Sequence, residues 1–254
     1  MKALQQPAFI IHSRPYRESS FIVELFSRDH GRVACVARGA RRGKRGTGVP
    51  QPFSPLLASW VGRGPLFTMT EAEVTPVAGG KFVAGAKFVA GSGRLAGDHL
   101  VGGLYMNELI MRLLEPGDVH RRLFEGYTLT LAGLAEQAPM SVILREFEYL
   151  LLRECGYAPD FTRCAATGQA ISAGGRYKLV IDEGFSRLPD EGSPAGTDPA
   201  GSYEGSALLA IAAGDYAMRA HRRAALHIFR RLLDGHIGER GLTSRSLLSS
   251  GRDG

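Results

Sequence analysis

The sequence lacks the features of secreted, disulfide-bonded and membrane-spanning proteins. Its 254 residues include only three cysteines, Cys35, Cys155 and Cys164, whose wide separation excludes a disulfide framework and is typical of a reducing compartment. No run of 18 apolar residues occurs, and residues 1–13 hold no apolar stretch long enough for a signal peptide. We therefore expect a cytoplasmic protein that does not span a membrane.

Motifs for catalysis, nucleotide binding and metal binding are also missing. Residues 39–45, GARRGKR, resemble a P-loop, but the glycines are one residue too close and no Ser or Thr follows Lys44. None of the seven histidines lies four residues from another, and Cys164 is followed at the spacing of a zinc half-site by Thr167, which cannot replace a thiolate. We expect no catalytic residues, no cofactor and no bound metal, and therefore a binding protein rather than an enzyme.

Positive charge is concentrated in the first third of the chain. The net charge is +6, and residues 1–78 hold 11 Lys and Arg against five Asp and Glu, while the remainder holds 20 of each. No acidic residue occurs between Asp29 and Glu71. Such one-sided charge predicts a polyanionic neighbour, either a nucleic-acid backbone or an anionic lipid surface. A basic loop that is merely solvated is the alternative.

The same region shows the alternating apolar and polar pattern of short β-strands. Strands are expected over residues 8–13, 20–26, 32–38, 53–61 and 66–74. Five short strands in fewer than 80 residues predict a small closed Greek-key barrel, with an OB-fold as the best-fitting type and an SH3-like barrel as the alternative. In an OB-fold, arginines contact phosphates and aromatic rings stack on bases. Tyr16 and Trp60 are the stacking candidates, although core packing is more common for such residues.

After about residue 79 the apolar period becomes helical. Helices are expected over Leu100–Leu114, then from a cap at Asp118 to Pro139, and then from a cap at Ser141 to Gly156. The fold class is therefore α+β: an N-terminal five-stranded OB-fold barrel followed by a mainly α-helical domain. We place the domains at residues 1–78 and 79–254, with a small zinc-free, β-containing insert at about 157–202.

The last third of the chain adds a strand, a loop and a basic helix to this scheme. A strand is expected over Tyr177–Asp182, and an exposed loop over Pro189–Gly201 because Asp, Gly, Pro and Ser are frequent there. A helix is expected over Ala217–Leu233. Its apolar face contains Met218, Ala225, Ile228, Phe229 and Leu232, and its opposite face contains Arg219, Arg222, Arg223 and Arg230. The arginines form either a second polyanion-binding surface or an ordinary solvated face.

Blocks along nearly the whole chain resemble the RecO recombination mediators. In chain order they are HSRPYRES at 12–19, GRV at 31–33, ARGAR at 37–41, QPFSPLL at 51–57, GLYMNEL at 103–109, LREFE at 144–148, GYAPD at 156–160 and LTSRSLL at 242–248. The number of blocks and their matching separations make the resemblance specific. Many relatives carry a four-cysteine zinc module after the GYAPD block, whereas this sequence keeps only Cys164, so the insert is expected to fold on apolar packing alone.

The resemblance implies a nucleoid-associated DNA repair protein of the RecF-type pathway. Such proteins bind single- and double-stranded DNA, anneal complementary strands, bind the acidic C-terminal tail of the single-stranded DNA-binding protein, and work with RecR to load RecA onto gaps. The tail-binding residues that it implies here are Arg145 and Tyr149, and the alternative for Arg145 is a salt bridge with Glu148 or Glu146. An RNA-binding or translation-associated OB-fold protein is the alternative function.

The candidate site combines the two basic segments. The expected nucleic-acid contacts are Arg14, Arg17, Arg32, Arg38, Arg41, Arg42, Lys44, Arg45 and Arg63 in the barrel region and Arg219, Arg223 and Arg230 on the later helix. Binding through them should weaken steeply with salt and depend little on base sequence.

Overall fold

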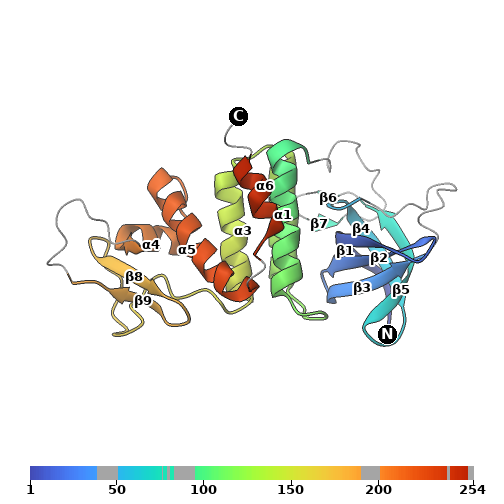
Figure 1. The fold of residues 1–254 in the computed structure, drawn as a ribbon, viewed down its shortest axis with the longest axis horizontal. Coiled ribbons are helices and arrows are strands. Elements are labelled where there is room, and N and C mark those ends of the chain that lie inside the picture. The colour runs from blue at the N-terminus through green and yellow to red at the C-terminus, as the bar shows by residue number, and fades with distance from the viewer. Residues whose placement is uncertain are drawn as a thin grey trace. The chain divides into compact units, whose positions relative to one another are not determined.

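The structure, a computed structural model, describes residues 1–38, 51–75, 77–78, 81–82, 95–189, 201–238 and 241–250 (Figure 1). The chain divides into two compact units. The first comprises Met1–Met140 and Leu242–Gly254, and the second comprises Ser141–Gly241. The first compact unit includes helices as well as the barrel. The predicted domain boundary, with one domain at residues 1–78 and the other at 79–254, stays a prediction.

A closed five-stranded barrel forms the N-terminal part of the first unit, as the alternating sequence pattern predicts. Its strands are β1 (Lys2–Tyr16), β2 (Ser20–Ser27), β3 (Gly31–Ala37), β4 (Pro55–Val61) and β5 (Leu66–Val74). The order around the barrel is β1-β2-β3-β5-β4, in which β3 and β5 pair in parallel and the other neighbours are antiparallel. This confirms the OB-fold prediction. A two-stranded ribbon, β6 (Val77–Ala78) and β7 (Lys81–Phe82), follows the barrel.

Apolar side chains that alternate along the strands fill the barrel. Val23, Leu25 and Val33 are buried in this core, together with Cys35 and Trp60. Burial, with a smaller contribution from the nearby carboxylate of Glu24, raises the pKa of the Cys35 thiol to about 12, so the thiol stays protonated and unreactive at neutral pH. Trp60 is fully buried and therefore cannot stack on a base.

Two helices share a core with the barrel. They are α1 (Gly97–Leu113) and α2 (Arg121–Ala135). Phe9 of β1 and Phe26 of β2 contact the rings of Phe124 and Tyr127 on α2, with centroids between 5.1 and 5.7 Å apart. The Tyr127 hydroxyl donates a hydrogen bond to Oδ1 of Asn107 on α1 at 2.6 Å. The barrel and these helices are thus continuous in their packing.

The helix beginnings differ from those predicted. Helix α2 has His120 as its N-cap, so Asp118 does not cap it, and α3 (Met140–Glu154) already contains Ser141. Asp118 has a different role, in the connection between α1 and α2. Its carbonyl oxygen lies 1.9 Å from where a Cβ would stand on Gly31, which has a φ of +62°. Only glycine fits this barrel turn, because the backbone of the helical connection lies against it.

The short helix α6 (Thr243–Ser250) returns from the far end of the chain to pack on α1. The Glu108 carboxylate on α1 accepts hydrogen bonds from the backbone N–H groups of Thr243 and Ser244, both at 2.9 Å, and from the Ser244 hydroxyl at 2.6 Å. Glu108 therefore caps the first turn of α6 from outside the helix, which satisfies N–H groups that a helix start leaves free.

We expect Glu108→Gln to destabilise the chain by about 1 kcal/mol at pH 7, as loss of a helix cap does. Burial raises the pKa of Glu108, but the hydrogen bonds from Ser244 and Thr243, with the charge of Arg112, lower it by more. A carboxyl whose folded pKa is lowered stabilises above its ordinary pKa and loses that contribution as the pH falls through the folded value. Thermal unfolding should therefore separate the two proteins at pH 7 and less so below about pH 4. A gap of constant size across this range would contradict the charged cap.

The second unit combines helices with a small sheet. It contains α3, the sheet strands β8 (Arg176–Val180), β9 (Gly184–Arg187) and β10 (Ser202–Glu204), and the helices α4 (Gly205–Ala212) and α5 (Arg219–Ile237). The sheet order is β10-β8-β9, which confirms the predicted β-containing insert, with the strand expected at Tyr177–Asp182 found as β8. Phe161, Phe185 and Phe229 pack together in its core. Of the loop expected over Pro189–Gly201, residues 190–200 lie outside the described residues.

No helix in the part of the chain that the structure describes has both the length and the apolar character of a membrane-spanning segment.

Candidate nucleic-acid interface

Three exposed arginines gather at one end of the barrel. Phe21, near the start of β2, pairs with Pro15 on one side and with Ala37 on the other, so the ends of β1 and β3 flank it. The nearby arginines, here called the barrel-end arginines, are Arg14 on β1, Arg17 in the β1–β2 turn and Arg38 directly after β3; all are exposed. None forms an ion pair with a carboxylate among the described residues. Their charges are therefore open to an external anion.

An aromatic ring belongs to this end of the barrel. The guanidinium carbon of Arg17 lies 5.1 Å from the centroid of the Tyr16 ring, a cation–π distance. Tyr16 is half-buried. Of the two sequence-predicted stacking candidates, only Tyr16 thus has ring surface near solvent.

The glycine-rich basic loop begins directly after Arg38. Its predicted contacts, Arg41, Arg42, Lys44 and Arg45, lie outside the described residues. They stay predictions from the sequence.

Arg32 differs from the barrel-end arginines because its charge is used inside the protein. Its Nη1 donates a hydrogen bond to the Met111 carbonyl near the end of α1 at 2.5 Å, and its Nε lies 3.7 Å from Oε2 of Glu24. The side chain is only 15% exposed. A cation beside the last carbonyls of a helix is favourable, so Arg32 joins the barrel to α1. Its charge is therefore used within the protein and is not open to an external anion.

Arg63 lies exposed in the β4–β5 turn, apart from the barrel-end arginines. Val61, at the end of β4, pairs with Lys2 at the beginning of β1, whereas Arg14 and Arg17 lie at the other end of that strand. Arg63 is therefore open to solvent, but the strand pairing does not bring it beside the three others.

The arginines of α5 have three different environments. Arg219 and Arg223 are exposed and line a groove of about 860 Å³ together with Ser202 of β10 and His227. Arg230 is exposed and lies 3.9 Å from Asp234, an i,i+4 ion pair. A fourth arginine on this helix, Arg222, instead donates hydrogen bonds to backbone carbonyls that precede the helix. Arg219, Arg223 and Arg230 therefore keep their charges at the surface, as does Arg231, which is also exposed and was not among the predicted contacts.

The apolar face predicted for this helix is largely confirmed. Ala225, Ile228, Phe229 and Leu232 are buried, but Met218 is 58% exposed because it precedes the first helical residue.

Arg145 and Tyr149, the residues implied for tail binding, lie on α3. The Arg145 guanidinium donates a hydrogen bond to Oε1 of Glu148 at 2.6 Å, and the two side chains are only 9% and 2% exposed. The salt bridge that the sequence left open is therefore present and buried. Tyr149 is half-buried and stacks on Phe229 with centroids 5.8 Å apart. Burial raises the pKa of its hydroxyl, which stays protonated at neutral pH.

Arg153 is a further candidate that the sequence blocks did not indicate. It lies one helical turn after Tyr149 and is exposed, and its guanidinium carbon lies 5.7 Å from the Tyr149 ring centroid. The i,i+4 spacing of an aromatic and an arginine on a predicted helix could have identified this pair.

Comparison with known families decides the identity. The model described as Recombination protein O N terminal matches residues 1–77, and Recombination protein O C terminal matches residues 94–246. The chain belongs to the RecO family. RecO proteins take part in DNA repair and recombination.

Relatives named DNA repair protein RecO match the chain over almost its full length. The protein of Cellvibrio japonicus is 38% identical over 252 residues, 99% of each chain. That of Nitrosococcus oceani is 38% identical over 253 residues, 98% of this chain and 94% of the relative, and that of Ralstonia nicotianae is 37% identical over 250 residues, 96% and 83% respectively. The resemblance stated from the sequence blocks is thereby confirmed.

Proposed function

We propose that the chain is a recombination mediator in bacterial DNA repair. It binds single- and double-stranded DNA, anneals complementary strands, and with RecR helps to load RecA onto gaps covered by the single-stranded DNA-binding protein. The observation that carries this proposal is the group of barrel-end arginines, exposed and free of carboxylate partners among the described residues, on an OB-fold of the RecO family.

Annealing needs a protein that lowers the repulsion between two polyanions. Each arginine that contacts a phosphate releases condensed counterions, and this release supplies most of the sequence-independent affinity. The barrel-end arginines can hold one strand, with Tyr16 available to stack on a base. Arg219, Arg223 and Arg230 provide a second surface of the same charge for DNA.

We assign binding of the acidic tail of the single-stranded DNA-binding protein to the solvent-facing side of α3. Tyr149 is half-buried and Arg153 beside it is exposed, an arrangement suited to a carboxylate next to an apolar side chain. In this arrangement Arg153 supplies the accessible charge, and Arg145 supports the helix from inside through Glu148.

Annealing of complementary oligonucleotides coated with the single-stranded DNA-binding protein tests this function. Fluorescence quenching between labelled strands should show that the chain accelerates annealing of naked strands, and of coated strands only when the coating protein keeps its acidic tail. Arg153→Gln should lose the acceleration on coated strands and keep it on naked ones, whereas Arg163→Gln, an exposed arginine of the same unit, should keep both. Failure to accelerate naked strands, together with tight RNA binding, would instead indicate the RNA-binding alternative.

A further inference from the structure

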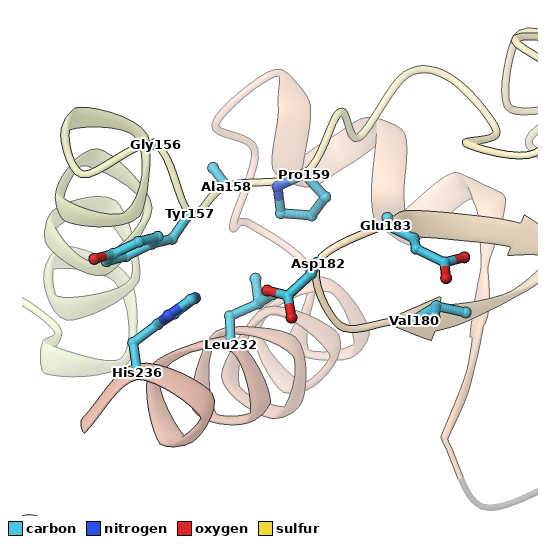
Figure 2. Close-up of a pocket in the computed structure, with 10 residues that line it drawn as sticks. Gly156, Tyr157, Ala158, Pro159, Val180, Asp182, Glu183, Leu232 and His236 are labelled. Atoms are coloured by element: carbon cyan, nitrogen blue, oxygen red, sulfur yellow. The ribbon is translucent and has the colours of Figure 1, made fainter. Parts of the chain in front are cut away.

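A small cavity in the second unit takes no part in the DNA-binding or tail-binding surfaces. It has a volume of about 280 Å³ and is lined by the segment after α3, the β8–β9 turn and the last turns of α5. Figure 2 shows these three segments converging on it. Side chains from distant parts of the sequence therefore meet around one space.

One wall of the cavity is a stacked aromatic pair. The ring of Tyr157 lies on the imidazole of His236 with centroids 3.7 Å apart and planes 13° from parallel, as Figure 2 shows. Pro159 and Leu232 add apolar surface beside this pair. These two residues suit the aliphatic stem of a polar group.

A single carboxylate is directed into the cavity. In Figure 2 the side chain of Asp182, at the β8–β9 turn, is directed towards Leu232, whereas the neighbouring Glu183 directs its carboxylate away. Asp182 has no ion-pair partner in the part of the chain that the structure describes. The cavity thus offers two acceptor oxygens directed towards Leu232.

The charges that line the cavity favour some classes of ligand over others. Phosphates are disfavoured because Asp182 and Glu183 both carry negative charge at the lining. Hard divalent cations need several oxygen ligands, and no group of three or more His, Cys, Asp or Glu side chains suited to a metal occurs among the described residues. A guanidinium fits better than an ammonium, because its planar group can donate two parallel hydrogen bonds to one carboxylate.

We propose that this cavity binds the guanidinium group of an arginine side chain presented by a partner protein. Asp182 accepts its N–H groups, and Leu232 and Pro159 contact its aliphatic stem. The site is independent of the proposed DNA binding, since none of its residues belongs to the basic surfaces.

Titration of the full chain with N-acetyl-L-arginine amide tests this assignment. Amide chemical shifts of Tyr157, Asp182 and His236 should move saturably, with roughly millimolar affinity. N-acetyl-L-citrulline amide has the same shape without the charge and should bind at least tenfold more weakly. Asp182→Asn should weaken arginine binding at least tenfold, and Glu183→Gln, which removes an equal charge from the neighbouring residue, should change it less than twofold.

Asp182→Asn is a conservative test because Asp182 has a φ of +68°, and asparagine tolerates this left-handed conformation. If that variant does not fold, the comparison between arginine and citrulline binding to the unmodified chain still tests the proposal.

Equal affinity for the two probes would overturn the proposal, as would equal weakening of arginine binding by Asp182→Asn and Glu183→Gln. Preferential shifts with dCMP would overturn it in favour of a nucleotide, and tighter binding of free L-arginine than of the blocked form would overturn it in favour of a small molecule. DNA binding unchanged in Asp182→Asn separates this site from the proposed function.

Discussion

Replacing Arg145 with alanine is expected to lower the free energy of unfolding by about 3 to 5 kcal/mol, because it breaks a buried, hydrogen-bonded ion pair by removing one of its two charges. The two side chains are 9% and 2% exposed, so solvent screens their interaction little. Urea unfolding of the chain and its variant measures this difference. Tail binding and DNA binding should then decline together at temperatures where the variant unfolds.

The double variant Arg145→Met and Glu148→Leu is the control for this effect. Removing both charges and keeping apolar volume avoids burying one member of the pair alone, so the double variant should recover a large part of the lost stability. An Arg145→Ala protein as stable as the original, and impaired only in binding the acidic tail, would show instead that the guanidinium acts on the partner.

The barrel was predictable because each of its strands is indicated by a pattern in consecutive residues. Alternation of apolar and polar residues with a period of two marks each strand, and β1 to β5 all lie where this pattern occurs. The ends of elements carry less information. Strand β1 extends back to Lys2, beyond the apolar run at 8–13, because its pairing with β4 supplies the backbone hydrogen bonds that the local pattern does not signal.

Helix ends were harder to predict because distant contacts compete with local capping signals. Asp118 is a good capping residue by type, but its backbone lies against Gly31 of the barrel. The neighbouring Gly117 N–H donates a hydrogen bond to the Arg32 carbonyl at 2.9 Å. Both contacts join segments that are far apart in the sequence, so no local pattern reports them. With this connection held against the barrel, helix α2 begins only after His120.

The exposure of charged residues was the least predictable part of the candidate site. Arg32 has the same residue type and strand setting as an exposed arginine, but its acceptor, the Met111 carbonyl, is 79 residues away in sequence. Arg145 lies three residues from Glu148, so its salt bridge could be foreseen, while its burial depends on tertiary packing that the sequence does not show. Residue type therefore indicates the candidate charges, and only the fold separates those at the surface from those used internally.

The triple variant Arg14→Gln, Arg17→Gln and Arg38→Gln is expected to weaken binding of single-stranded DNA by about 100-fold at about 0.1 M salt. Each lost phosphate contact should reduce the slope of log K against log salt by about 0.7, or about 2 for the three. All three side chains are exposed, so the fold should be unaffected. Fluorescence anisotropy with a labelled oligonucleotide over a series of salt concentrations measures both quantities.

A matched triple variant, Arg28→Gln, Arg121→Gln and Arg122→Gln, removes the same charge from the same compact unit. Arg28 follows the opposite end of β2, and both Arg28 and Arg121 are ion-paired with Asp29. Arg28 and Arg121 therefore have less free charge to offer a phosphate, so the slope should change by less than about 1. If the two triple variants lowered the slope equally, binding would follow the net charge of the unit and the barrel-end arginines would have no special position in the interface.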